Sequence, residues 1–296
     1  VLSTYTGGDI ANSGTISATA ESEDMAAAYG IGSSYTNGSV DNSGRIQATA
    51  DGENTASAYG IDARYTLGDV VNSGRIVADA QAHNTLAAGI TASHVGGDVV
   101  NSGAIEAYAM SMSSGAYGLN IDNAEGDVIN SGSILAEAES DVSTAAWGIR
   151  IYHLDGQLLN SGPVTATATS GGFASAFAIF TSDTGAILNE GDLTATATGV
   201  GTDSGADAFG IEADFTYGDI DTSGGITATA TATGAGYADA EGIDADDTDG
   251  VVSNSGTIAT VATAVAGLAE ATGIDTDESQ GVDNSGTVIV SARSSG

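Results

Sequence analysis

The sequence has no cysteine, no lysine, one proline and few aromatic residues. Without cysteine, neither disulfides nor thiolate metal ligands can hold the fold together, and the redox compartment cannot be read from the composition. Five arginines stand against 39 acidic residues, which gives a formal net charge of −34 at pH 7. Phosphate recognition needs clustered Lys or Arg, so this charge excludes nucleic acid and anionic membrane surfaces as partners.

The sequence also lacks any apolar stretch that approaches the roughly 18 residues of a membrane-spanning helix. We therefore expect no membrane insertion. No secretory leader is recognisable, and the chain begins at Val1 rather than Met. We expect it to be a processed mature protein or a fragment of a longer one.

What the sequence does contain is a periodic tripeptide. Asn-Ser-Gly recurs at intervals of 29 or 30 residues over most of the chain. The first residue of each copy is Asn12, Asn42, Asn72, Asn101, Asn130, Asn160, Asn254 or Asn284, and degenerate copies begin at Asn189 and Thr222. Ten copies at a nearly constant period predict a repeat architecture, forming a single domain over residues 1–296.

Apolar residues hold fixed places around each tripeptide. An aliphatic residue lies two positions before its first residue, another lies four positions after it, and an alanine always lies eight positions after it. The second aliphatic position is occupied by Ile16, Ile46, Ile76, Ile105, Ile134, Val164, Leu193, Ile226, Ile258 and Val288. The resulting Ile-x-Ala-x-Ala pattern has the period of two residues that is typical of a half-buried strand.

A second apolar motif, Ala-x-Gly-Ile, closes most repeats, as at 28–31 and 58–61, and a short third strand is expected after its Ile. Three strands in about 30 residues match one coil of a parallel β-helix. The predicted fold class is therefore all-β, a parallel β-solenoid of about ten coils with three strands per coil. With a strand spacing of ~4.8 Å, ten coils make a rod roughly 48 Å long.

The polar residues at the corners also receive structural interpretations. We expect the Asn of each coil to hydrogen-bond the Asn of the next coil and so form a ladder. We expect the Gly at the third tripeptide position to supply a positive φ at the corner. An acidic series three residues before the Asn position is interpreted as turn chemistry. It comprises Asp9, Asp69, Asp98, Asp127 and Asp219.

The units at 58–61 (Ala-Tyr-Gly-Ile) and 68–76 (Gly-Asp-Val-Val-Asn-Ser-Gly-Arg-Ile) resemble the β-strand repeats of bacterial autotransporter passengers and related surface adhesins. The resemblance covers the whole chain and is specific for a solenoid, while repeats of this kind are mostly scaffold. It implies a secreted protein, extracellular or at the surface of a Gram-negative cell. The chain departs from that family in having no recognisable cap.

The repeats run to both ends of the sequence without a polar capping segment, although repeat arrays normally need one. Val1 aligns with Ile31, and the sequence ends just after the second strand of a coil. We expect either that the array continues in a longer chain or that chains stack head to tail through their uncapped coil ends into an open filament. Other cells and extracellular polysaccharide are further candidate partners.

Three C-terminal repeats carry a grid of carboxylates just after the Ile of the closing motif. The first column is Glu212, Asp244 and Asp275, and the second, two residues later, is Asp214, Asp246 and Asp277. Residues two apart on a strand share a face, so the six side chains are predicted to lie close together. Calcium is the candidate cofactor, because hard cations bind oxygen ligands and would relieve the repulsion between these charges. The alternative is an acidic face that is only solvated.

The sequence offers little for catalysis. His83, His94 and His153 are the only histidines, and no Ser/His/Asp spacing recurs around them. His94 and His153 align with Tyr5, Tyr35 and Tyr65 and are interpreted as members of a corner stack. A β-helix that binds or degrades polysaccharide is the alternative function, but such an enzyme would need grouped acids with a base. We therefore predict that the chain is not an enzyme.

A Thr array gives a minor alternative, an ice-binding solenoid. Three consecutive coils carry Thr at alternating positions, as in 165–169, 194–198 and 227–231. Other coils carry Glu, Tyr, Asp and Met at these places, so ordinary β-propensity is the simpler explanation. The main functional prediction is an extracellular structural protein, either a subunit of a head-to-tail filament or the shaft of a surface adhesin.

Overall fold

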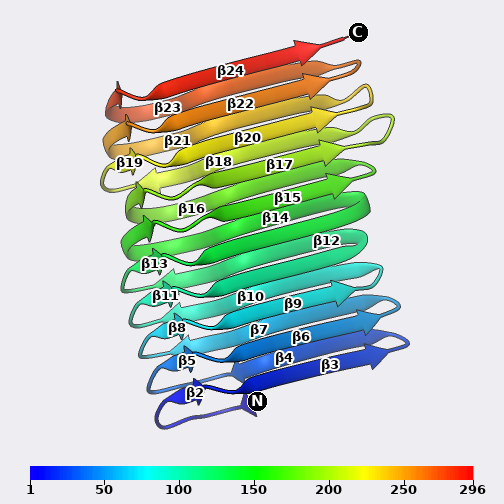
Figure 1. Ribbon diagram of the computed structural model, residues 1–296, viewed down its shortest axis with the longest axis vertical. Coiled ribbons are helices and arrows are strands. Elements are labelled where there is room, and N and C mark those ends of the chain that lie inside the picture. The colour runs from blue at the N-terminus through cyan, green and yellow to red at the C-terminus, as the bar shows by residue number, and fades with distance from the viewer. Residues whose placement is uncertain (296) are drawn as a thin grey trace.

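The computed structural model describes residues 1–295 and has the predicted all-β architecture, a parallel β-solenoid of about ten turns (Figure 1). The two chain ends lie at opposite ends of the stack. Residues 1–295 contain no helix, and hence none long and apolar enough to cross a membrane.

Each coil has three sides, as predicted. The first side has short strands: β2 (Ile10–Asn12), β5 (Val40–Asn42), β8 (Val70–Asn72), β11 (Val99–Asn101), β13 (Val128–Asn130) and β19 (Ile220–Thr222). The second side has β3 (Thr15–Ser22), β6 (Arg45–Gly52), β9 (Arg75–Gln81), β15 (Val164–Ser170), β17 (Leu193–Gly199), β20 (Gly225–Ala232), β22 (Thr257–Ala264) and β24 (Thr287–Ser294).

The third side begins with β1 (Leu2–Ser3), β4 (Met25–Ser33), β7 (Thr55–Thr66), β10 (Asn84–Val95) and β18 (Gly205–Thr216). In the remaining coils the strand continues around one or two corners, and a single element covers more than one side. These elements are β12 (Ala104–Ala124), β14 (Ser133–Asn160), β16 (Phe173–Asn189), β21 (Tyr237–Asn254) and β23 (Leu268–Asn284).

Like residues stack on like residues along the rod. All strand pairs are parallel, and their register places Ile46 against Ile76 and Val70 against Val99. The inward columns of Ile, Val and Ala are almost completely buried along the middle of the rod. β-Branched side chains suit a pleated, half-buried surface, and alanine keeps the cross-section narrow enough for opposite sides to touch.

The Asn ladder is continuous over the first seven coils. From Asn12 to Asn189, each side-chain Nδ2 donates to the Oδ1 of the Asn in the next coil at 2.7–2.8 Å. Asn189 then donates to the Thr222 hydroxyl at 3.2 Å, and the Asn–Asn contact resumes only between Asn254 and Asn284 at 2.7 Å. No hydrogen bond between the side chains of Thr222 and Asn254 is found in the described part of the chain. The Asn–Asn hydrogen bonds of the ladder satisfy side-chain amides that are buried at the corner.

The acidic series at the turns has the structural role that the sequence indicated. The Oδ1 atoms of Asp9, Asp69 and Asp98 each accept a hydrogen bond from a backbone N–H of the next coil, at 2.9–3.0 Å. Asp127 and Asp219 do the same at 2.9 and 2.8 Å. These carboxylates therefore tie successive corners together.

The expectation of a positive φ at the tripeptide glycine is wrong. None of the glycines in residues 1–295 has a positive φ. What requires glycine is the distance between coils. A Cβ built on Gly44 would lie 2.0 Å from the carbonyl oxygen of Gly14, and one on Gly74 would lie 1.9 Å from that of Gly44. Real Cβ atoms do not approach oxygen so closely, so this corner accepts no side chain.

A second glycine column, in the Ala-x-Gly-Ile motif, is explained by packing across the core. A Cβ on Gly118 would lie 2.1 Å from the Cγ2 of Ile134, and the same clash recurs in other coils. Ala178 occupies this position in one coil, where Leu193 replaces the β-branched residue opposite. Leucine is not branched at Cβ and has no Cγ2 methyl group, so its presence at 193 leaves room for the Cβ of Ala178.

Candidate functional site

The six carboxylates predicted as a grid lie on the outer face of β18, β21 and β23. Glu212, Asp244 and Asp275 stand opposite one another in the parallel register. The pairs Ala213–Ala245 and Ala245–Thr276 fix the next residues as neighbours too. The second column of Asp214, Asp246 and Asp277 therefore lies beside the first. The structure brings the six residues together on one face, as two columns that become more exposed toward β23.

Three further acidic residues, which the sequence reasoning missed, extend this face. They are Asp207, Asp239 and Glu241, on the same side of β18 and β21. A signal was available, because they lie just before the Gly-Ile pair at positions that alternate with buried alanines. We call these three residues and the six predicted carboxylates the acidic face.

Burial and mutual repulsion keep part of the acidic face protonated. The pKa of Glu212 is raised to about 8, first by burial and then by the charges of Asp244 and Asp214. The pKa of Glu241 is also raised to about 8, again chiefly by burial. Asp207 and Asp244 are raised to about 6 for the same reasons. At pH 7 the face therefore holds neutral carboxyl groups beside ionised ones.

Several oxygens of this face have no hydrogen-bond partner within the described chain. They are Glu212 Oε2, Glu241 Oε2, Asp207 Oδ1 and Asp239 Oδ1. Such groups can bind a proton or a counter-cation. Among residues 1–295, however, no three His, Cys, Asp or Glu side chains are arranged to hold one metal ion. Calcium at this face stays a prediction from the sequence.

A column of stacked aromatic rings occupies the same outer side in the preceding coils, and the sequence reasoning also missed it. Tyr117, Trp147, Phe177 and Phe209 stack with centroid distances of 4.5, 5.7 and 5.1 Å and interplanar angles of 3–7°. The next residue in this column is Glu241. The aromatic column therefore ends where the acidic face begins.

Arg150, which follows Trp147 on β14, lies against the side of the aromatic column. Its Cζ lies 5.1 Å from the centroid of the Trp147 ring, 5.3 Å from that of Tyr117 and 4.4 Å from that of Tyr152. Such cation–π contacts stabilise the stack and hold the guanidinium against it. This is one of only five basic side chains in the protein, apart from histidine.

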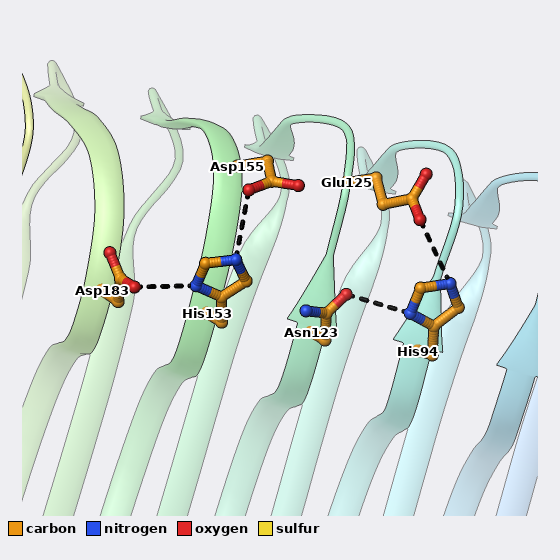
Figure 2. Close-up of polar contacts among 6 residues, drawn as sticks. All are labelled: His94, Asn123, Glu125, His153, Asp155 and Asp183. Atoms are coloured by element: carbon orange, nitrogen blue, oxygen red, sulfur yellow. Dashed lines mark hydrogen bonds and ion pairs between the residues drawn. The ribbon is translucent and has the colours of Figure 1, made fainter.

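His94 belongs to the corner stack that the alignment indicated. The rings of Tyr5, Tyr35, Tyr65 and His94 follow one another with centroid distances of 5.6, 5.1 and 4.5 Å. Nδ1 of His94 donates to the side-chain oxygen of Asn123 at 3.0 Å (Figure 2). The opposite ring nitrogen faces Glu125 at 3.5 Å. This imidazole is oriented by its neighbours and serves the stack.

His153 lies further along the same corner, between two carboxylates (Figure 2). Its Nδ1 is 2.8 Å from Asp183 Oδ2, and its Nε2 is 3.1 Å from Asp155 Oδ1. The hydrogen bond with Asp183 raises the pKa of His153, and burial offsets part of that effect. Both ring nitrogens are engaged, so His153 is suited to an ion pair rather than to metal binding.

The Thr array lies on the second side of the rod. Thr165, Thr194 and Thr227 are neighbours in register, and the residues two and four positions later repeat the arrangement. The flanking strand β14 carries Leu135, Glu137 and Glu139 in the same columns. The regular patch is therefore three coils wide.

In comparisons with known proteins, no family model, no curated protein and no solved structure matches this chain, whose fold is a β-solenoid.

Proposed function

We propose that this protein is a length of extracellular shaft, either the stalk of a surface adhesin or a subunit of a head-to-tail filament. The observation that carries the proposal is the constancy of the cross-section. The same inward columns recur from coil to coil, the same corner hydrogen bonds recur in most coils, and no disulfide is involved. A rod built in this way gains length by adding coils and keeps its stiffness.

The surface chemistry supports a location outside the cell. The absence of lysine and scarcity of arginine leave few sites for trypsin-like proteases, and the net charge of −34 favours solubility. The resemblance to autotransporter passengers and surface adhesins points the same way. Secretion and a place at the bacterial surface are parts of this proposal.

Negative-stain electron microscopy of the purified 296-residue chain, with and without calcium, separates the two versions. We expect either uniform fibres, which would make the chain a filament subunit, or single rods of roughly 48 Å, about ten strand spacings, which would make it a stalk segment. Compact or irregular particles would contradict both versions. Calorimetry with calcium, with sodium as the control, tests the sequence-based calcium prediction, and a melting temperature unchanged by chelator would count against it.

A polysaccharide-active protein is the second candidate, favoured by the protonated carboxyl groups beside ionised ones on the acidic face. A carboxyl with a pKa near 8 can act as a general acid at neutral pH. Glycosidases place such an acid across from a carboxylate. An assay for new reducing ends on a panel of polysaccharides, with Glu212→Gln and Glu241→Gln as controls, tests this role. If both variants retain the activity, the acidic face is not the catalytic site.

A further inference from the structure

The corner between the second and third sides contains a hollow of about 720 Å³ with an unusual lining. His83, Met110 and Met112 all line it. Met110 and Met112 are 51% and 45% exposed, so neither acts as a core filler. Two of the three methionines in the protein thus lie beside one of its three histidines, at the surface of an otherwise polar corner.

Backbone contacts place the three side chains in adjacent coils. The N–H of Met112 donates to the carbonyl oxygen of His83 at 3.1 Å. Met110 stands opposite Gln81 in the register of β12 and β9. The Nε2 of Gln81 donates to the sulfur of Met110 at 3.8 Å, so this thioether is directed toward the coil that carries His83.

The imidazole of His83 is held in the tautomer that a metal ligand needs. Its Nδ1 contacts the backbone carbonyl oxygen of Glu53, in the preceding coil. A carbonyl oxygen can only accept, so Nδ1 carries a proton, and in the neutral imidazole the lone pair is on Nε2. In metalloproteins a ligating histidine characteristically donates its other N–H to a carbonyl or carboxylate in this way. Within the described chain, Nε2 of His83 has no hydrogen-bond partner.

The charges around the hollow attract cations without forming a site for a hard ion. Asp51, Glu53, Glu139 and Asp141 line the same space and give it a negative potential. No three carboxylate or imidazole groups in residues 1–295 are arranged around one metal position. The ligands left are two thioethers and one imidazole, a soft set that selects Cu(I) over Ca²⁺, Mg²⁺ or Mn²⁺.

We propose that His83 Nε2 and the sulfurs of Met110 and Met112 form a binding site for a soft monovalent cation, Cu(I). The site takes one ion per chain, and Gln81 releases the sulfur of Met110 when the ion binds. The rod thereby carries a copper-binding position on its side in addition to its structural role.

The test is an anaerobic titration of the full chain with Cu(I) held by the chromophoric chelator bicinchoninate. We expect the protein to withdraw one equivalent of Cu(I), and X-ray absorption of the loaded protein to show sulfur neighbours with a nitrogen neighbour. Met110→Leu, Met112→Leu and His83→Asn are each expected to weaken binding by on the order of tenfold or more. A large excess of Ca²⁺ is expected not to compete.

Matched controls are Met25→Leu and His94→Asn. Met25 is an exposed methionine outside the hollow, and His94 is a histidine of the corner stack. Both variants are expected to bind Cu(I) like the wild type. All substituted side chains are at least partly exposed, and circular dichroism confirms that each variant is folded. The proposal is overturned if the Met110→Leu/Met112→Leu double variant keeps its affinity, if Ca²⁺ displaces the ion, or if X-ray absorption shows only oxygen and nitrogen neighbours.

Discussion

The middle coils and the C-terminal coils have the same interior, but the outer face is aromatic in the middle coils and acidic in the C-terminal coils. In the inward column, Ile149, Ile179, Ile211 and Ile243 follow one another without a break. Two positions before each of these lies the outward column, which changes from an aromatic stack to acid where Phe209 meets Glu241. The interior specifies the coil, whereas the outer face is free to carry either rings or carboxyl groups.

The two outer faces differ in how the residues of one column interact. Stacked rings about 5 Å apart attract each other and add to the burial of apolar area. Carboxylates at the same spacing repel each other, unless some of them bind protons or cations. The stacking of the rings should therefore depend little on pH, while the stability of the acidic region depends on its ionisation.

The largest expected effect tests whether the interior is the same in both regions. Gly118→Ala in the middle coils and Gly242→Ala in the acidic coils both place a Cβ within 2.3 Å of an isoleucine Cγ2. We expect each to lower the free energy of unfolding by about 3 kcal/mol, because the core must shift to accept the methyl group. Native-state hydrogen exchange of the adjacent amides measures the loss separately for each region.

The natural pair of Ala178 and Leu193, in place of a glycine and a β-branched residue, supplies the control for this prediction. If the clash with the Cγ2 methyl group of Ile134 is the cause, adding Ile134→Leu to Gly118→Ala should recover much of the lost stability. A double-mutant cycle measures this coupling between the two positions. A Cβ on Gly118 would also lie 2.5 Å from the carbonyl oxygen of Gly148 in the next coil. Additive effects would show that this contact, rather than Ile134, excludes the side chain.

The second prediction concerns the aromatic column. Trp147→Ala removes a ring that stacks on two others and carries Arg150, and we expect a loss of about 2.5 kcal/mol. Glu241→Phe should have the opposite sign, since the new ring would extend the stack from Phe209. Urea denaturation of both variants makes the comparison. A stabilisation by Glu241→Phe that is equalled by Glu241→Ala would attribute the gain to loss of the carboxyl group alone.

The fold was predictable from the sequence because the inward columns of the first and second sides repeat a residue type at a fixed distance from Asn-Ser-Gly. The carboxylate columns were predictable for the same reason, since alignment on the Ile of each coil gives the register. The need for glycine was misinterpreted, because coil-to-coil distance is a tertiary property that no local pattern contains. The aromatic column was missed because its members differ in type, and because Ala88 separates it from the stacked pair of Tyr29 and Tyr59 in the preceding coils. The proximity of His83 to Met110 and Met112 follows only from the stacking of two corners.

The third prediction is a pH dependence confined to the acidic coils. Glu212 and Glu241 titrate near 4.5 in the unfolded chain and near 8 in the folded one. Between these values the unfolded state releases protons that the folded state retains, so the acidic coils lose stability as pH rises from 4.5 to 8. We expect Glu212→Gln to stabilise them by about 2 kcal/mol at pH 9, a value reduced for solvent screening, and to have no effect at pH 4.

Hydrogen exchange at the two pH values, measured in β21 and in β9, checks this prediction after correction for the intrinsic exchange rates. The strand β9 lies outside the acidic face and should be unaffected. An equal response in both strands would indicate a global charge effect of the net −34, and no response would indicate that folding does not raise the pKa of Glu212.

The smallest expected effect lies at Thr222, where the Asn ladder is interrupted close to the boundary between the two regions. Thr222→Asn supplies an amide that can accept from Asn189 and donate to Asn254, and we expect a gain of about 1 kcal/mol. The matched change Asn130→Thr interrupts the intact ladder and leaves a buried amide partner unsatisfied, so its cost should be somewhat larger, about 1.5 kcal/mol. Urea denaturation of the two variants measures both. Effects of these sizes mean that the ladder contributes bond by bond; a cost for Asn130→Thr well above about 1.5 kcal/mol means that a continuous ladder is stronger than its separate bonds.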